Sequence, residues 1–252
     1  MGMSFLIVIP REQYSSESSS SPGISFWLVP TTYETDTLRK ILALRPVPVK
    51  SASSFPTFHP HVTLASIPDP NEPDGDMLAL RLRESIPVGN PALPLTFQSV
   101  EAGDTYTRSV YANITPTSEL MHLHAHIHTA LGHSANTPKF PHMSLFYIAD
   151  EDADARVKTL QELGRKGVVI QGAEHATLDA RVLDEVDDNA IAHLNGFTAS
   201  EIWIVRIEGP VEEWKVLDKI VLSTGEKSHH YGFAHFKDAY HEMKDAMHAR
   251  AE

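Results

Sequence analysis

The pattern of hydrophobic and polar positions predicts a chain of mixed strands and helices. Short apolar runs bounded by proline or glycine predict strands, and longer runs with apolar residues three or four positions apart predict amphipathic helices. The predicted strands are Ile24–Val29, Val62–Ile67, Leu95–Val100, Ser109–Ile114, Met143–Ile148, Glu201–Glu208 and Trp214–Leu222. The first predicted helix starts at Thr35 or Asp36 and runs to Leu44. The other predicted helices are Met77–Ser85, Ser118–Leu131, Asp152–Leu163 and Ala234–Ala251. This order predicts an α+β fold.

Local signals also predict how some of these elements end. Thr35 or Asp36 is a candidate cap for the first helix, and Gly132 is expected to stop the helix that begins at Ser118. A turn at Gly103–Asp104 is expected to join the two central strands into a hairpin.

Composition and charge narrow the possible chemistry. The chain has 252 residues, a net charge of −12 and no cysteine, so thiol nucleophiles and thiolate metal sites are excluded. The acidic balance argues against long nucleic acid as a partner, because such binding requires many lysines and arginines. No apolar run is long enough to span a membrane, and Met1–Pro10 lacks the features of a signal peptide. We therefore expect an intracellular, cytoplasmic monomer without a membrane span.

Two short segments share one pattern. Residues 60–64 (Pro-His-Val-Thr-Leu) and 141–145 (Pro-His-Met-Ser-Leu) both read proline, histidine, apolar residue, hydroxyl residue and leucine, each where a strand begins. Side chains two positions apart on a strand point to the same face, so each histidine should share a face with the hydroxyl that follows it. If the two strands are related by a pseudo-two-fold axis, two imidazoles and two hydroxyls surround one site.

Such a site has the groups that hydrolysis of a cyclic phosphodiester needs. A base must activate water and an acid must protonate the departing oxygen, and histidine can do both near neutral pH. Hydroxyls and strand amides can hydrogen-bond the non-bridging phosphate oxygens. The pattern predicts His61 and His142 as catalytic residues and Thr63 and Ser144 as phosphate-binding residues. No metal or cofactor is required.

The paired motifs resemble those of the 2H phosphoesterases, which are defined by two His-x-Thr/Ser motifs. The motif spacing, the first strand at Phe26–Pro30 and the segment Glu201–Pro210 are similar to the fungal and plant cyclic phosphodiesterase branch. This resemblance implies a bilobal, LigT-like fold with two antiparallel sheets around a central cleft and helices outside. It also implies hydrolysis of nucleoside 2′,3′-cyclic phosphates to 2′-phosphates, and of ADP-ribose 1″,2″-cyclic phosphate, a by-product of tRNA splicing.

The resemblance further implies roles for single residues. Tyr147, three residues after Ser144, matches a tyrosine that contacts the phosphate in plant relatives. Similar enzymes use the second histidine, here His142, to activate water and the first, here His61, to protonate the leaving oxygen. The residues themselves leave the reverse assignment open. The chain departs from plant relatives in lacking cysteines.

The expected organisation is a single two-lobed catalytic domain over residues 1–252, with its core at about 24–222. Residues 11–23 are serine-rich and are expected to be flexible. Residues 173–195 are interpreted as an acidic insertion, and residues 233–252 as a helical C-terminal tail.

Other residues of the same types have plainer interpretations. His175 begins a third His-x-Thr string, but no proline precedes it and its surroundings suit a helix or loop, so we interpret it as a decoy. His122, His124, His126 and His128 are expected to form a solvated or partly packed helix face rather than a metal site. We interpret Arg108 as an exposed turn residue, and Phe26 and Trp27 as core residues.

Three other functions remain open from the sequence. The first is an RNA end-processing 2H enzyme of the 2′-5′ ligase or exonuclease type, which a basic track would favour. The second is a nucleotide-binding module that holds phosphate without turnover. The third is a histidine-ligated metallohydrolase, which chelation would inactivate.

Overall fold

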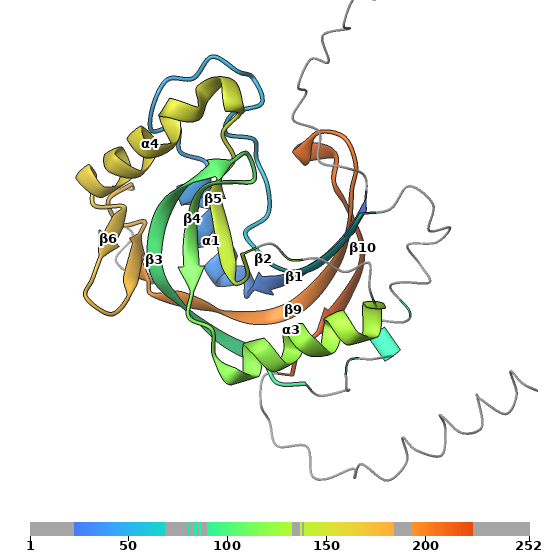
Figure 1. Cartoon of the computed structure of the whole chain (residues 1–252). Helices are drawn as coiled ribbons and strands as arrows, with labels where there is room; N and C mark the ends of the chain where they lie inside the picture. The colour runs from blue at the N-terminus through green and yellow to red at the C-terminus, as the bar shows by residue number, and fades with distance from the viewer. Residues whose placement is uncertain are drawn as a thin grey trace, which may run out of the picture.

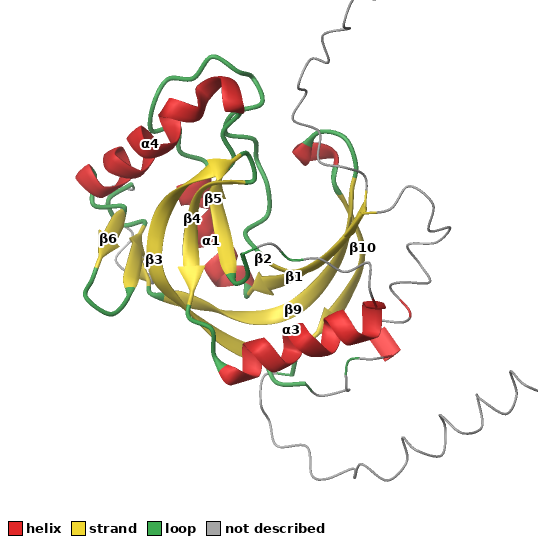
Figure 2. Ribbon diagram, in the orientation of Figure 1, coloured by secondary structure: helices red, strands yellow, loops and turns green. Residues whose placement is uncertain are grey.

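The strands of this protein form two antiparallel sheets (Figures 1 and 2). The computed structural model describes residues 23–68, 80, 83–84, 86, 90–132, 137, 139–183 and 193–223. The larger sheet contains β1 (Gly23–Pro30), β2 (Val62–Pro68), β3 (Leu93–Thr105), β4 (Arg108–Ile114), β5 (His142–Phe146), β9 (Gly196–Ile207) and β10 (Lys215–Val221). The smaller one contains β6 (Val169–Gln171), β7 (Ala176–Asp179) and β8 (His193–Leu194). The predicted α+β class is confirmed.

The larger sheet bends until it closes on itself. Its strand order is β1-β2-β5-β4-β3-β9-β10, and β1 pairs with β9 as well as with β2. Figure 1 shows the resulting curve, with β3, β4 and β5 on one side and β9 and β10 sweeping under and up the other. The two halves meet at a single registered pair between β2 and β5, Val62 and Met143.

Three helices cover the face of the larger sheet that carries the core. They are α1 (Thr32–Leu42), which lies against β1 and β5, α3 (Ser118–Leu131) against β2, and α4 (Ala153–Arg165) against β3 and β4. The fully buried Leu38, Ile41 and Leu120 of the first two helices belong to the same hydrophobic cluster as Val62 and Met143. The main core therefore occupies the helix-covered face, and a smaller buried cluster of Trp27, Val29 and Val205 lies on the other face.

The start of α1 differs from the prediction. Its cap is Thr31, whose side chain accepts a hydrogen bond from the Glu34 backbone N–H while the Glu34 carboxylate accepts one from the Thr31 N–H. This is a capping box, and the Thr-x-x-Glu spacing that signals it is visible in the sequence. The predicted cap at Thr35 or Asp36 was wrong because these residues already lie within the first helical turns.

The hairpin of β3 and β4 turns later than predicted. The strands continue past Gly103, with Ala102 opposite Val110 and Thr105 opposite Arg108, and the turn falls at Tyr106 and Thr107. A side chain at Gly103 would collide with the carbonyl oxygen of Arg108. The glycine therefore permits a close approach at an irregularity in the ladder, and it does not form the turn.

The other predicted helices and strands agree with the structure or fall outside the described residues. The Ser118–Leu131 helix is confirmed, and Gly132 ends it with a φ of 77°. Part of the presumed insertion, at β7 and β8, is regular sheet. Most of the predicted Met77–Ser85 helix, residues 11–22 and residues 233–252 lie outside the described part of the chain. Among the described helices, none is long and apolar enough to cross a membrane.

Candidate functional site

The two His-x-Thr/Ser motifs lie side by side where β2 meets β5. Val62 pairs with Met143 in antiparallel register, so His61 lies beside Ser144 and Thr63 beside His142. Val62 and Met143 are fully buried in the core. Because the pleat alternates, the four polar residues point to the opposite, open face. The predicted pseudo-symmetric arrangement of two imidazoles and two hydroxyls is therefore present in the structure.

Neighbouring strands extend this polar face. On β4, Tyr111 lies opposite Ser144 and Asn113 opposite His142. On β3, Glu101 accepts hydrogen bonds from the Tyr111 hydroxyl at 3.0 Å and from the Asn113 amide at 2.6 Å. These bonds tie the strand beside His142 to the next strand, so the surroundings of that imidazole are fixed by side chains as well as by the backbone.

His61 is deeply buried and held in one orientation. Its side chain stacks on the Trp27 indole, with ring centroids 3.7 Å apart and an interplanar angle of 11°. The Nδ1 atom lies 2.6 Å from the carbonyl oxygen of His59, so Nδ1 carries the proton and donates it. Nε2 is then the nitrogen left for chemistry. Burial, with smaller contributions from His59 and His142, lowers the pKa of His61 to about 3.

This buried imidazole should make the protein less stable in acid. Unfolded histidine has a pKa near 6.5, and folding lowers that of His61 to about 3, so the unfolded state binds more protons between these values. Stability should therefore fall as pH drops below 6.5, by about 2 kcal/mol for this group between pH 7 and pH 5. Urea unfolding of the wild type and His61→Ala at both pH values measures it. An identical pH dependence in the two proteins would contradict the prediction.

His142 is oriented in the same way but lies nearer to solvent. Its Nδ1 donates to the carbonyl oxygen of Lys139 at 3.0 Å, so Nε2 is again available. The ring meets the edge of Tyr111 at a centroid distance of 5.6 Å. Burial lowers the pKa of His142, the Lys139 hydrogen bond opposes this, and the positive charge of Arg108 lowers it further. Both imidazoles are therefore neutral at pH 7 before substrate binds.

The three other predicted site residues surround these imidazoles. Thr63 is half-buried next to His142, and the Ser144 hydroxyl donates to the Thr107 carbonyl oxygen at 2.6 Å. Tyr147 follows the end of β5 and stacks on Phe58 with ring centroids 4.1 Å apart. Its side chain is 3% exposed, and burial raises its pKa. Tyr147 also forms a side-chain hydrogen bond with Ser144, which opposes that rise and places its hydroxyl beside the motif.

The structure corrects the predicted place of Arg108 and agrees with the predicted burial of Phe26 and Trp27. Arg108 is 8% exposed, so its interpretation as an exposed turn residue was wrong; it lies over the Tyr111 ring and acts on His142. Phe26 is in the main core as expected, and Trp27 is buried as well, in a smaller cluster with Val29 and Val205, where it lies opposite Thr63 and stacks on His61. Adjacent strand residues point to opposite faces, so these neighbours pack on different sides of the sheet.

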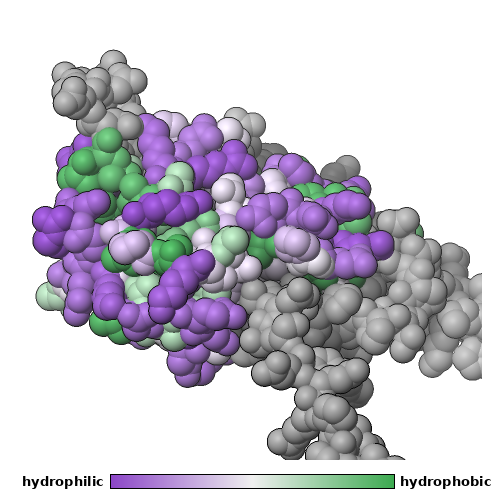
Figure 3. Space-filling view, turned by 90° about the horizontal axis from the view of Figure 1, so that it is seen from above, coloured by the Kyte–Doolittle hydropathy of each residue, from purple (hydrophilic) through white to green (hydrophobic). Residues whose placement is uncertain are grey.

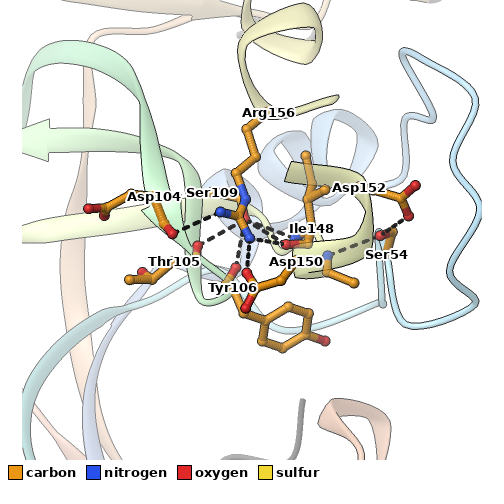
Figure 4. Close-up of polar contacts among 10 residues, drawn as sticks. Ser54, Asp104, Thr105, Tyr106, Ser109, Ile148, Asp150, Asp152 and Arg156 are labelled. Atoms are coloured by element: carbon orange, nitrogen blue, oxygen red, sulfur yellow. Dashed lines mark hydrogen bonds and ion pairs between the residues drawn. The ribbon is translucent and has the colours of Figure 1, made fainter. Parts of the chain in front are cut away.

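A buried network positions the β3–β4 turn (Figure 4). Arg156 of α4 donates to the carbonyl oxygen of Asp104 at 2.8 Å and to that of Ile148 at 2.9 Å, and it pairs with the Asp150 carboxylate. Ser109 is fully buried within reach of the Thr105, Tyr106 and Ile148 carbonyl oxygens. These contacts fix the turn that carries Thr107, the hydrogen-bond partner of Ser144, and Arg108.

A second part of the network secures the loop that precedes the first motif (Figure 4). The Asp152 carboxylate accepts hydrogen bonds from the Lys50 and Ser51 N–H groups at 2.8 and 2.9 Å and from the Ser54 hydroxyl at 2.9 Å. Ser54 in turn accepts a bond from the Ala149 N–H at 3.0 Å. The chain leading to His61 is thus attached to the segment that follows β5.

The other histidines stay away from this site. On α3, His122 and His126 are exposed, while His124 packs on Phe140 and His128 bonds to Thr137. This is the partly packed face that was expected, and no group of three potential metal ligands occurs among the described residues. His175 lies in the loop between β6 and β7 of the small sheet, which agrees with the predicted helix or loop context, and its side chain is 51% exposed.

Seen from above, the surface is mostly hydrophilic (Figure 3). Hydrophobic side chains appear as separate areas between charged and polar ones. Large exposed hydrophobic residues in the described part, such as Val157, Val182 and Val221, come from different elements.

The chain is similar to solved structures and to one protein-family model. A crystal structure of a phosphoesterase is 13% identical, covering 80% of this chain and 99% of that one with a TM-score of 0.48. Escherichia coli LigT with 3′-AMP is 13% identical (81% and 99% covered, TM-score 0.46), and the apo form is 15% identical (81% and 99%, TM-score 0.47). No curated protein sequence matches the chain. The family model for cyclic phosphodiesterase-like proteins matches residues 22–222, so this chain belongs to the cyclic phosphodiesterase-like family.

Proposed function

We propose that this member of the family hydrolyses nucleoside 2′,3′-cyclic phosphates to nucleoside 2′-phosphates. The observation that carries the proposal is the Val62–Met143 pair, which places the two motifs antiparallel on one open face. In each imidazole, Nδ1 donates a hydrogen bond to a backbone carbonyl oxygen, and Nε2 takes no part in that bond. Two oriented nitrogens beside two hydroxyls match the needs of phosphodiester hydrolysis.

The phosphate is proposed to lie between the two imidazoles. Thr63 and Ser144 each lie beside the histidine of the other motif and donate to the non-bridging oxygens of the phosphate, the Ser144 hydroxyl turning from the Thr107 carbonyl oxygen to the phosphate, and Tyr147 supports Ser144. One imidazole takes a proton from water as it attacks phosphorus, the 3′ oxygen–phosphorus bond breaks, and the other imidazole protonates the departing 3′ oxygen. The phosphate anion raises the pKa of nearby imidazoles, so the acid acquires its proton when substrate binds.

Burial supports one polarity for this pair. His61 is 5% exposed and stacked beneath Trp27, whereas His142 is half-buried. The acid must hold a proton before the reaction starts, and protonating the deeper imidazole costs more desolvation free energy. We therefore assign His61 as the base that activates water and His142 as the acid, the reverse of the assignment that the resemblance implies.

Hydrolysis of 2′,3′-cyclic AMP in excess chelator tests the function. The expected product is adenosine 2′-phosphate, identified by phosphorus NMR, at a rate that chelator does not change. The 3′-phosphate as product would contradict the proposed bond cleavage, and loss of turnover on chelation would contradict catalysis by the imidazoles alone. Turnover confined to 2′-5′-linked oligonucleotides would favour the RNA end-processing function instead.

A further inference from the structure

Two consecutive residues at the end of the β3–β4 turn reach the histidine site. The Thr107 carbonyl oxygen accepts the Ser144 hydrogen bond. The guanidinium carbon of Arg108 lies over the Tyr111 ring, 5.2 Å from its centroid. The same ring contacts His142 at a centroid distance of 5.6 Å. Arg108 and the imidazole of the second motif therefore contact one aromatic ring.

The Arg108 side chain is buried and keeps an unused hydrogen-bond donor. The residue is 8% exposed, and its buried Nε–H has no hydrogen-bond partner among the described residues. Its terminal nitrogen pairs with the Asp104 carboxylate at 3.1 Å, but the Asp104 side chain is 81% exposed. An ion pair with an exposed carboxylate is weak, whereas a buried N–H without a partner costs free energy. A ligand that accepts a hydrogen bond from Nε would remove that cost.

The proposed reaction needs a positive charge that the two motifs do not supply. The substrate phosphodiester is an anion, whereas both imidazoles are neutral at pH 7 before it binds. Moving an anion from water into a partly buried site costs free energy unless a cation compensates. The Arg108 guanidinium is a cation close enough to act on His142. The carboxylates bonded to Arg108 and Tyr111, those of Asp104 and Glu101, are both exposed, so solvent screens them.

We infer that the Arg108 guanidinium binds a non-bridging oxygen of the substrate phosphate next to His142. This inference rests on the proposed function and adds a substrate-binding residue that lies outside both His-x-Thr/Ser motifs. The free Nε–H donates first, and the terminal nitrogen exchanges the exposed Asp104 carboxylate for the phosphate, because a guanidinium presents parallel donors that fit phosphate oxygens. The bound anion offsets the Arg108 charge that lowers the pKa of His142, so substrate binding favours the protonated acid.

Three variants test the inference through KM for 2′,3′-cyclic AMP and calorimetric binding of adenosine 2′-phosphate. Arg108→Met keeps an apolar side chain over Tyr111 and removes the charge and the donors, so KM should rise and binding weaken about tenfold. Arg108→Lys keeps the charge without the fork and should recover only part of the binding. Asp104→Asn removes the competing carboxylate and should tighten binding about twofold. In the Arg108→Met background, Asp104→Asn should have no effect, because no guanidinium is left to release.

Arg165→Met is the matched control, because it removes the same charge from an exposed arginine that pairs with Glu162 on α4. Its KM and its binding of adenosine 2′-phosphate should equal those of the wild type. Urea unfolding at pH 7 shows whether Arg108→Met is folded, and Asp104→Asn tests the inference at an exposed side chain without disturbing the core. Equal binding by the wild type and folded Arg108→Met, unchanged binding in Asp104→Asn, or no binding by the wild type would overturn the inference. Binding that depends on Arg108 without hydrolysis of 2′,3′-cyclic AMP would support the anion site and count against the proposed function.

Discussion

Replacing either motif histidine with alanine is expected to lower kcat for 2′,3′-cyclic AMP by about 1,000-fold, because positioned acid–base groups contribute 100- to 10,000-fold. The two substitutions should be similarly damaging, since proton removal and proton donation occur in the same reaction. Initial rates with purified His61→Ala and His142→Ala measure the effect. Urea unfolding at pH 7 shows whether each variant is folded.

His175→Ala is the matched control for these variants. His175 begins the same His-x-Thr pattern but is half exposed beside the small sheet. Its substitution should leave kcat and KM unchanged. Comparable activity in His61→Ala, His142→Ala and His175→Ala would rule out the proposed chemistry.

A substrate with a nitrophenolate leaving group separates the two roles of the histidines. Such a leaving group departs without a proton, so loss of the general acid should matter less than loss of the base. With a nucleoside 4-nitrophenyl phosphodiester, His142→Ala should therefore keep more of its wild-type rate than His61→Ala. The opposite order would show that His61 is the acid.

Arg156→Met is expected to lower the free energy of unfolding by about 3 kcal/mol. The guanidinium is 5% exposed at the side chain and donates to the carbonyl oxygens of Asp104 and Ile148, which methionine would leave without those partners. Losing charge-assisted hydrogen bonds at buried groups costs this order of free energy. Urea denaturation at pH 7 gives the value.

The same variant should also reduce catalysis in the molecules that remain folded. Arg156 and Ser109 hold the turn whose Thr107 carbonyl accepts the Ser144 hydrogen bond, so a looser turn should raise KM through poorer phosphate binding. Arg165→Met is the matched control on the same helix, because Arg165 is 69% exposed and pairs with Glu162 at the surface. It should change neither stability nor KM. If both variants behave alike, Arg156 does not position the turn.

The sequence predicted much of the secondary structure because those signals are local. Alternation within residues 62–67 identified β2 and the shared face of His61 and Thr63, and the periodicity of residues 118–131 identified α3. The repeated Pro-His-apolar-hydroxyl-Leu pattern singled out both candidate imidazoles without knowledge of their contacts. The cap of the first helix could also have been predicted from the sequence, because Thr31 and Glu34 have the spacing of a capping box.

Only the tertiary structure decided how these pieces meet. The pair joins Val62 and Met143, which are 81 positions apart in the chain, and it brings each histidine beside the other motif's hydroxyl. Alternation along the strand separates Phe26 from Trp27, but the stacking of Trp27 on His61 depends on the pairing of β1 with β2. Arg108 is buried in a turn that Arg156 of α4 and Ile148, which follows β5, hold in place. Alternation and propensity are properties of neighbouring residues, whereas register and burial depend on segments distant in the chain.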